Sequence, residues 1–291
     1  MRLIITNNVS VWAGTYISNK INQYMKTQKE FNLHQSKLNI NGKLDKKANK
    51  NFVLGLPTGS TAIELYFYLV KMYQKKQLSF KNVITFNMDE YINLPREHPQ
   101  SYWTFMHENL FNHVDIAKEN INLPNGMAAD LKLECEEYDN KIEEIGGINL
   151  FVGGVGENGH LAFNEPYSSL SSNTRDKELS NTTLAANSRF FNEDIYLVPK
   201  SAITVGINTL LKAKEIIILV KGVKKSNALY HCVEGSVSHM WPISVLQFHE
   251  KAIIVADEEA CNELKVKTYR YFKELKDEYS YINDTMENTF S

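Results

Sequence analysis

The sequence predicts an α/β protein built on an open, mostly parallel, Rossmann-like sheet with helices on both faces. Apolar runs of strand length recur along the chain, at residues 52–56, 83–86, 148–153, 216–220 and 252–256. Segments with the three- and four-residue apolar spacing of a helix follow several of these runs. Continuous apolar strands that alternate with helices are typical of a parallel sheet covered on both faces.

The first elements follow this pattern in order. Residues 1–6 predict a first strand, and residues 9–24 predict a helix with one apolar face. Residues 26–51 are rich in Lys, Asn and Gln and contain too few apolar side chains to pack, so we expect an exposed polar insertion there. The strand at 52–56 ends in a tight turn at Pro57, and a helical pattern follows.

The later elements complete the sheet. The last long helix is expected to begin near Asp257, where acidic residues fill its first turn, and to continue through Leu275. A polar tail follows from about residue 277. Because only one short element precedes the polar insertion, we interpret it as an insertion and not as a domain linker. We therefore expect residues 1–291 to form a single α/β domain.

The composition limits the kind of partner. Of the 291 residues, 43% are hydrophobic, and no apolar run is long enough to cross a bilayer. A formal net charge of −2 argues against a nucleic-acid partner, which would need an excess of basic residues. Cys135, Cys232 and Cys261 lie far apart, so we expect neither a disulfide framework nor a zinc site. The N-terminal apolar stretch is too short for a signal peptide, and the cytoplasm is the expected location.

The loops that follow the strands should form one site, because ligands of open parallel sheets bind at the carboxyl ends of the strands. A phosphate site is the first candidate: hydroxyl and N–H groups gather at a predicted helix start, over Thr58, Gly59, Ser60 and Thr61. An ordinary strand–helix turn explains the same residues. Lys225 and Arg189 could supply cations, and the aromatic neighbours of Arg189 predict a partly buried guanidinium. A solvated surface lysine is the alternative for Lys225.

The second candidate feature is the stretch from Asn149 to Pro166, in which an apolar strand leads into a glycine-rich loop. The unperturbed pKa of an imidazole lies near neutral pH, and Glu165 follows His160 by five residues, so the two could form a proton shuttle with its orienting carboxylate. A structural histidine in a plain turn is the alternative. Asp89 lies at the end of the strand at 83–86, where it could cap a helix or abstract a proton next to a carbonyl. Together these groups suggest aldose–ketose chemistry on a sugar phosphate.

Five segments carry a family likeness, in order along nearly the whole chain: residues 54–61, 86–91, 153–166, 186–191 and 233–241. Together they resemble the glucosamine-6-phosphate deaminase family. The resemblance implies conversion of glucosamine 6-phosphate and water to fructose 6-phosphate and ammonia, without metal or organic cofactor.

The resemblance also implies roles for individual residues. Asp89 matches the base that moves the C2 proton, His160 the group that opens the sugar ring, and Glu165 the carboxylate that positions the histidine. The matching phosphate site comprises Thr58, Gly59, Ser60, Thr61, Arg189 and Lys225.

Two positions depart from the family pattern. Asn158 stands where the family often has an acid that tunes the histidine; it can hydrogen-bond but cannot stabilise imidazolium by charge. Ala62 stands where a helix-starting proline is expected.

Family members are commonly hexamers, and some are activated by N-acetylglucosamine 6-phosphate between subunits. The matching residues here are Ser168, Arg175 and Lys177, with Met1 from a neighbouring subunit. The resemblance thus implies a homo-oligomer that binds small sugar phosphates.

Two other functions compete with the deaminase. A sugar-phosphate lactonase on a related fold would need a water-activating histidine but no base for a C2 proton, so Asp89 favours the deaminase. A non-catalytic sugar-phosphate sensor would need neither the base nor the ring-opening group.

Overall fold

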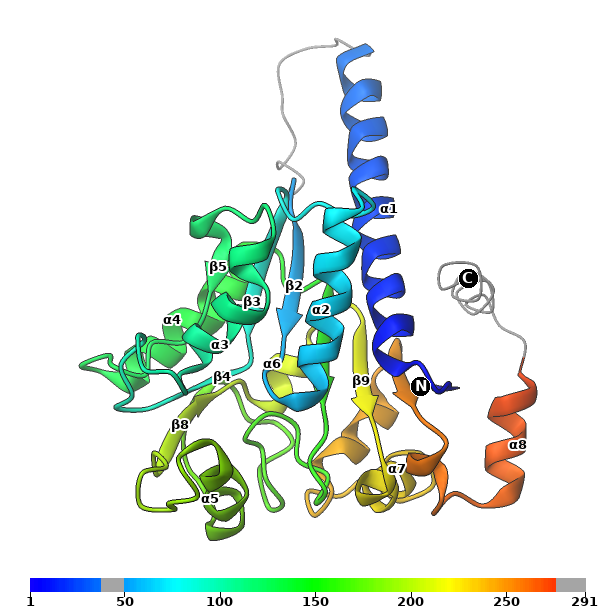
Figure 1. Ribbon diagram of the computed structural model, residues 1–291. Helices are drawn as coiled ribbons and strands as arrows, with labels where there is room; N and C mark the ends of the chain where they lie inside the picture. The colour runs from blue at the N-terminus through cyan, green and yellow to red at the C-terminus, as the bar shows by residue number, and fades with distance from the viewer. Residues whose placement is uncertain (38–49, 276–291) are drawn as a thin grey trace.

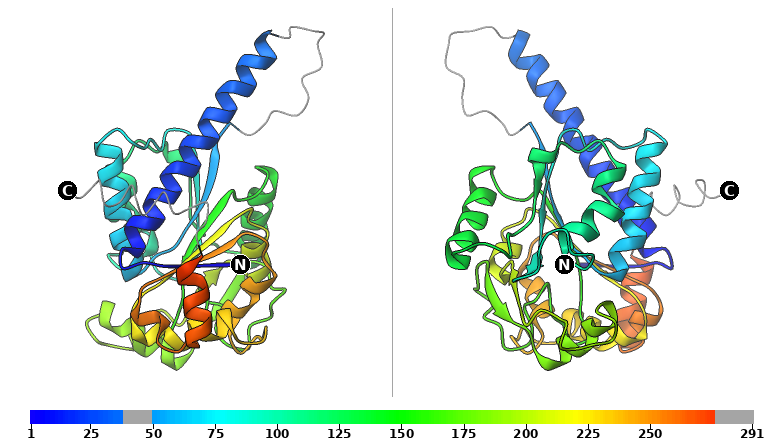
Figure 2. Two further views of the ribbon diagram at one scale, coloured as in Figure 1. Left: turned by 90° about the vertical axis from the view of Figure 1, so that its right-hand side faces the viewer. Right: turned by 60° about the vertical axis from the view of Figure 1, so that its left-hand side comes forward.

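The computed structural model describes residues 1–37 and 50–275 (Figure 1). Its centre is a seven-stranded sheet with the strand order β1-β10-β9-β6-β2-β3-β5, and every neighbouring pair runs parallel. Helices cover both faces (Figures 1 and 2). The predicted α/β class with a parallel sheet and two helical layers is therefore confirmed.

The strands of this sheet are β1 (Arg2–Ile5), β2 (Phe52–Leu56), β3 (Val83–Asn87), β5 (Ile121–Asn122), β6 (Leu150–Gly154), β9 (Ile216–Val220) and β10 (Ala252–Ala256). The α-helices are α1 (Val9–Lys37), α2 (Ser60–Gln74), α3 (Tyr102–Asn109), α4 (Leu131–Glu144), α5 (Asn181–Asn187), α6 (Ile207–Leu211), α7 (Ser226–Val233) and α8 (Val266–Glu274). Short 3-10 turns are η1 (Phe111–His113), η2 (Lys118–Asn120), η3 (Ser188–Phe190), η4 (Val223–Lys225), η5 (Pro242–Phe248) and η6 (Glu259–Cys261).

The central strands are apolar along their whole length because both of their faces are buried. In β9, Ile217 and Leu219 pack into one core cluster with α1 and α2, whereas Ile216 and Ile218 pack into the other with α4, α6 and α7. Successive strand side chains point to opposite faces, so each strand serves both clusters. This arrangement fixes the register of the sheet and aligns the strand ends on one edge.

Helix α1 extends further than the sequence pattern indicates. Its first half is buried through Trp12, Tyr16 and Ile17. It continues to Lys37 and projects past the sheet (Figure 1), so the first part of the predicted polar insertion is helical. Good helix formers such as Lys, Gln and Glu favour the helical conformation of this part of the chain. The rest of that insertion (38–49) and the predicted tail lie outside the described residues.

The expectation of a long helix from Asp257 is wrong. Asp257 instead accepts hydrogen bonds from the N–H groups of Gly222 (2.9 and 3.0 Å) and Ala260 (2.8 Å), which tie the end of β10 to the loop after β9. The chain forms only the short turn η6 there, and α8 begins at Val266.

A second sheet lies beyond the carboxyl ends of the main strands. It has the antiparallel order β4 (Asp89–Tyr91), β8 (Ser201–Thr204) and β7 (Arg175–Glu178). Thr204 pairs with Asp89 on one side and with Arg175 on the other. The small sheet thus places Asp89 and Arg175 in one row across three strands.

Within residues 1–37 and 50–275, no helix has the length and apolar character needed to span a lipid bilayer.

Candidate active site

Four strand ends build the candidate site. Strands β9, β6, β2 and β3 are consecutive neighbours in the sheet, and all run in the same direction. The loops that follow them therefore emerge side by side. They carry Lys225 after β9, His160 after β6, Thr58–Thr61 after β2 and Asp89 after β3.

The predicted phosphate residues surround the first turn of α2. Gly59 is the N-cap residue, and its φ of 102° is a conformation that favours glycine. A Cβ at this position would meet no atom within 4 Å, so the side of the turn at Gly59 is open. The N-terminus of a helix attracts anions through its N–H groups and its dipole. This turn is therefore a candidate site for an anion such as a phosphate group.

Two cations of the predicted phosphate site, Lys225 and Arg189, lie close enough to repel each other. Burial lowers the pKa of Lys225, and repulsion by Arg189 and Lys224 lowers it further, while Glu157 partly offsets these effects. Arg189 is exposed, with its guanidinium 4.6 Å from the ring centroid of Phe190. The expectation that Arg189 is partly buried is therefore wrong, because Phe190 is itself exposed. Neighbouring cations repel each other, and an anion bound between them would offset this repulsion.

Asp89 is a buried carboxyl group with an unused oxygen. The residue is 6% exposed, and its Oδ1 atom has no hydrogen-bond partner among the described residues. Burial raises the pKa of Asp89 to about 8, and the negative charge of Glu90 contributes. A buried acceptor without a partner costs about 1–3 kcal/mol. Such a cost is typical of a functional site that a ligand completes.

Glu90 is held in place by helix α3. Its carboxylate accepts hydrogen bonds from the backbone N–H groups of Tyr91 (2.9 Å), Tyr102 (3.0 Å) and Trp103 (2.9 Å). Two of these donors belong to the first turn of α3, where the helix dipole favours a negative charge. Glu90 therefore anchors the strand that carries Asp89, and it leaves Asp89 as the carboxyl group with free acceptor capacity.

The loop after β6 presents His160 in a defined orientation. Nδ1 of His160 lies 2.7 Å from Oδ1 of Asn158, and the His160 backbone N–H donates to the same oxygen at 3.3 Å. An oxygen that accepts from Nδ1 leaves Nε2 of the neutral ring as a proton acceptor. Below the ring, a Cβ at Gly156 would lie 2.1 Å from His160 atoms, so only glycine fits there.

The pKa of His160 is lowered to about 4, first by burial and then by the charge of Lys225, while Glu165 acts in the opposite direction. Glu165 itself is buried and accepts hydrogen bonds from the hydroxyls of Ser180 (2.8 Å) and Thr183. The Asn158 side chain thus accepts the hydrogen bond from the His160 ring, and Glu165 acts on the ring only through its charge.

The residues matched to an effector site lie on β7 and after the loop that carries His160. Arg175 donates from Nη1 to the Asn164 side chain at 2.9 Å, one residue before Glu165. The Oγ atom of Ser168 is buried and has no hydrogen-bond partner among the described residues. Lys177 follows on β7. Met1 is not part of this group in the chain: its Sδ lies 3.7 Å from Sγ of Cys232 on α7.

Sequence reasoning missed the aromatic residues that line this region. The Tyr102 hydroxyl lies close enough to the Thr58 side chain to affect the pKa of Tyr102, and the ring packs on Tyr91 with ring centroids 4.9 Å apart. Tyr102 thereby joins the phosphate turn to the strand that carries Asp89. The only signal in the sequence is the clustering of aromatic residues after Asp89, which an ordinary core would also produce.

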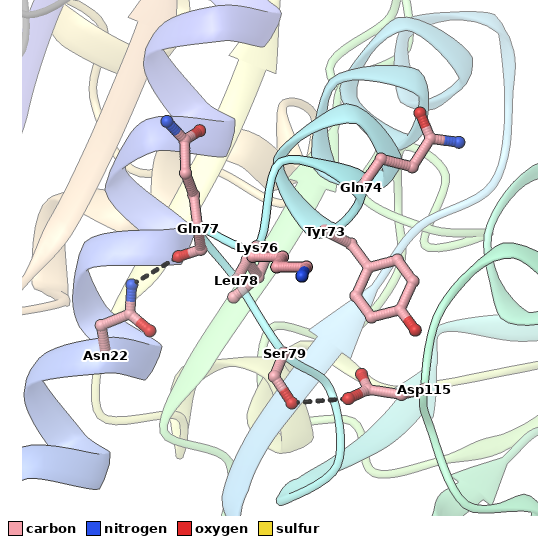
Figure 3. Close-up of a pocket in the computed structure, with 8 residues that line it drawn as sticks. All are labelled: Asn22, Tyr73, Gln74, Lys76, Gln77, Leu78, Ser79 and Asp115. Carbon is pink, nitrogen blue, oxygen red and sulfur yellow. Dashed lines mark hydrogen bonds between the residues drawn. The ribbon is translucent and has the colours of Figure 1, made fainter.

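A separate cavity of about 450 Å³ lies at the opposite edge of the sheet (Figure 3). Its lining includes Asn22 of α1 and residues between α2 and β3. Asn22 donates to the backbone oxygen of Gln77 at 3.0 Å, and Ser79 donates to Asp115 at 2.7 Å (Figure 3). These polar groups form hydrogen bonds with each other. They therefore differ from the strand-end site, where Oδ1 of Asp89 has no partner among the described residues.

Comparison with known proteins decides the family. Residues 33–255 match the family of glucosamine-6-phosphate isomerases and 6-phosphogluconolactonases. The chain belongs to this family. Among curated relatives of this isomerase and lactonase family, the glucosamine-6-phosphate deaminase of Fusobacterium nucleatum is 51% identical over 292 residues, covering 100% of this chain and 99% of that protein. The glucosamine-6-phosphate deaminase of Yersinia enterocolitica is 54% identical, covering 96% and 98%.

Solved structures of the isomerase and lactonase family agree. A monomeric glucosamine-6-phosphate deaminase is 33% identical, has a TM-score of 0.78, and covers 89% of this chain and 98% of its own. The 6-phosphogluconolactonase of Thermotoga maritima is 17% identical with a TM-score of 0.61, covering 88% and 98%. The second likeness shows a shared fold alone.

Proposed function

We propose that the protein is a glucosamine-6-phosphate deaminase, which converts glucosamine 6-phosphate and water to fructose 6-phosphate and ammonia. The observation that carries this function is the identity of 51–54% with deaminases over nearly the full length of both chains. The buried, unpartnered carboxyl oxygen of Asp89 supports it chemically. Hydrolysis of a lactone needs no base for a C–H proton, so this feature favours the deaminase over the lactonase.

In this proposal the phosphate of the substrate binds at Thr58–Thr61, with Arg189 and Lys225 as counter-charges. Nε2 of His160 takes a proton from the O1 hydroxyl and returns it to the ring oxygen, which opens the sugar to its aldehyde. Asn158 keeps the other ring nitrogen protonated through its hydrogen bond. Glu165 contributes a negative charge that favours the transient imidazolium.

Asp89 then moves the proton from C2 to C1. As a proton of the substrate ammonium also passes to O1, the open-chain aldehyde becomes the protonated imine of the ketose, and water addition with loss of ammonia gives fructose 6-phosphate. Asp89 must be ionised to act, whereas burial, with a contribution from the charge of Glu90, raises its pKa to about 8 in the free protein. The substrate carries an ammonium group next to the C2 proton, and an opposite charge within about 4–6 Å lowers a carboxyl pKa by about 1–3 units. Binding of the substrate thus favours the ionised form of Asp89, the form that acts as the base.

The test of this function is ammonia release from glucosamine 6-phosphate, together with formation of fructose 6-phosphate. The wild type should release ammonia, and Asp89→Asn should abolish isomerisation while sugar-phosphate binding is largely kept. A wild type that binds the sugar phosphate but releases no ammonia would favour the non-catalytic sensor. Hydrolysis of a sugar-phosphate lactone without deamination would favour the lactonase.

The proposal extends to regulation, assembly and location. N-acetylglucosamine 6-phosphate is the proposed allosteric effector, held by Ser168, Arg175 and Lys177, with the amino group of Met1 supplied by a neighbouring subunit. The proposed assembly is a homohexamer of single-domain subunits; one relative is described as monomeric, so the solution mass must be measured. The buried free thiols of Cys135, Cys232 and Cys261 support the cytoplasm as the location.

A further inference from the structure

One segment of the family likeness, residues 233–241, takes no part in the proposed proton transfers or in phosphate binding. It leads into a tight turn that we name the Trp241 hairpin, residues 238–244. Ser238 and Trp241 form an isolated antiparallel bridge, and the Trp241 N–H donates to the Ser238 carbonyl at 3.0 Å. The buried hydroxyl of Ser244 accepts from the Ser238 N–H at 2.9 Å and donates to the Ser238 carbonyl at 3.1 Å. The hairpin is thus rigidly closed.

This hairpin supports the turn that carries His160. The Ile243 N–H donates to the Gly159 carbonyl at 2.9 Å. A Cβ at Gly159 would lie 2.8 Å from Cε3 of Trp241 and 3.3 Å from Cγ2 of Ile243. Gly159 also has a φ of 79°, so both its conformation and its contact with the indole favour glycine. The backbone immediately before His160 therefore lies directly against the Trp241 ring.

The same hairpin holds the other end of the loop. The Tyr167 N–H donates to the His239 carbonyl at 2.9 Å. Residues 160–166, which include His160 and Glu165, are therefore held at both ends by hydrogen bonds to the Trp241 hairpin. A loop fixed at both ends has few ways to relax, and this limits the positions that the imidazole can adopt.

The indole of Trp241 in turn packs against helix α7. The ring of Trp241 stacks on His231 of α7 with centroids 4.0 Å apart and an interplanar angle of 12°. Helix α7 is anchored in the core by Leu229 and Cys232, both fully buried. A continuous line of contacts therefore runs from the core through His231 and Trp241 to Gly159 and the proton-transfer loop.

We propose that Trp241 is a positioning residue for ring opening, holding the Gly156–His160 turn so that the imidazole meets the substrate hydroxyl. This inference rests on the proposed function of His160. Trp241 touches neither Asp89 nor the phosphate turn in the described contacts. Its loss should consequently slow the proton transfer of His160 and leave the affinity for the phosphate group nearly unchanged.

The experiment compares Trp241→Ala, Trp241→Phe and Met240→Ala, the last a matched change at the exposed neighbour in the same hairpin. Displacement of a catalytic group by about 1 Å can cost about 100-fold in rate. We expect Trp241→Ala to lower kcat by about 10- to 100-fold with a change in KM below about threefold. Trp241→Phe should recover most of the rate, and Met240→Ala should equal the wild type. Unchanged kcat in Trp241→Ala, or equal losses in all three variants, would overturn the proposal.

Two further readouts separate positioning from general instability and from the proposed function. Gly159→Ala presses a methyl group onto the same indole from the other side, so it should give the same loss of kcat even if Trp241→Ala folds poorly. NMR titration of the His160 imidazole reports on the ring without any turnover. We expect Trp241→Ala to shift the His160 resonances and pKa even if the wild type released no ammonia. An unchanged His160 titration would reject positioning, whereas missing ammonia release alone would reject only the function.

Discussion

Replacing Asn158 with Asp tests how the loop after β6 controls proton transfer. In the wild type, Oδ1 of Asn158 lies 2.7 Å from Nδ1 of His160. Aspartate keeps this acceptor and adds a negative charge, which favours the imidazolium form. The wild-type ring has the opposite bias, because burial and Lys225 lower the pKa of His160 to about 4. The substitution should therefore raise the pKa of His160.

The size of the shift follows from the short contact. Two unit charges about 4 Å apart interact by about 4 kcal/mol at an effective dielectric constant of about 20, equivalent to about 3 pKa units. His160 keeps some contact with solvent, so screening reduces this value, and we expect a rise of about 1–3 units. In the kcat/KM profile, His160 adds a second, lower break to the acid limb, below the break set by Asp89, and this lower break should move upward by the same amount.

The assay is the pH dependence of ammonia release, with the His160 titration followed in parallel by NMR. Asn112→Asp is the matched control, because Asn112 is exposed in η1 and makes the same change in charge away from the strand-end loops. The control should leave the acid limb in place. If Asn158→Asp also leaves the acid limb and the His160 titration unchanged, the proposed contact between the two side chains is wrong.

Three further predictions concern Asp89 and the effector site. Because the pKa of Asp89 in the free protein is about 8, kcat/KM should rise with pH through that region. In the substrate complex the bound ammonium lowers the pKa of Asp89, so the rise in kcat should come about 1–3 pH units lower. Two profiles that superimpose would show that the substrate does not promote ionisation of Asp89. The folded-state pKa lies above the unfolded value of about 3.9, so the stability contributed by the protonated carboxyl is lost as pH rises from about 4 to 8. The difference of about 4 pKa units corresponds to about 5 kcal/mol. Asp89→Asn should therefore gain about 3–5 kcal/mol, or about 6–20 °C in Tm, at pH 8 relative to its difference from the wild type at pH 4. An equal difference at both pH values in thermal unfolding would contradict the raised pKa. Substrate saturation of the wild type should be sigmoidal and become hyperbolic with N-acetylglucosamine 6-phosphate. Lys177→Gln should need about tenfold more of this effector, because the change removes a charged hydrogen bond to the phosphate of the effector. Hyperbolic wild-type kinetics that do not respond to the effector would reject allosteric regulation.

The parallel sheet could be predicted because its strands have a simple physical signature. Strands such as β9 and β10 are buried on both faces, so every position is apolar and no alternation is needed to recognise them. The small antiparallel sheet lacks this signature. Strand β7 reads Arg-Asp-Lys-Glu and forms only because Thr204 and its neighbours on β8 complete its hydrogen bonds. Non-local pairing of this kind leaves no periodic trace in the sequence.

The same distinction applies to the candidate site. The grouping of His160, Lys225 and Thr58–Thr61 could be predicted from topology, since parallel strand ends share one edge. The partner of the imidazole could not, because it depends on side-chain conformation. Sequence spacing favoured Glu165, whereas Asn158 makes the hydrogen bond and the Glu165 carboxylate binds the hydroxyls of Ser180 and Thr183. The end of the last strand shows the same effect, because Asp257 binds the loop at Gly222 instead of starting a helix.

The central claim is that four strand-end loops form one site for glucosamine 6-phosphate. A crystal structure of the inactive Asp89→Asn variant with that sugar phosphate tests it most directly. We expect the phosphate at Thr58–Thr61 beside Arg189 and Lys225, C2 facing the side chain at position 89, and O1 within hydrogen-bond distance of Nε2 of His160. A sugar phosphate bound away from this edge, or with C2 and O1 turned away from these two side chains, would contradict the claim.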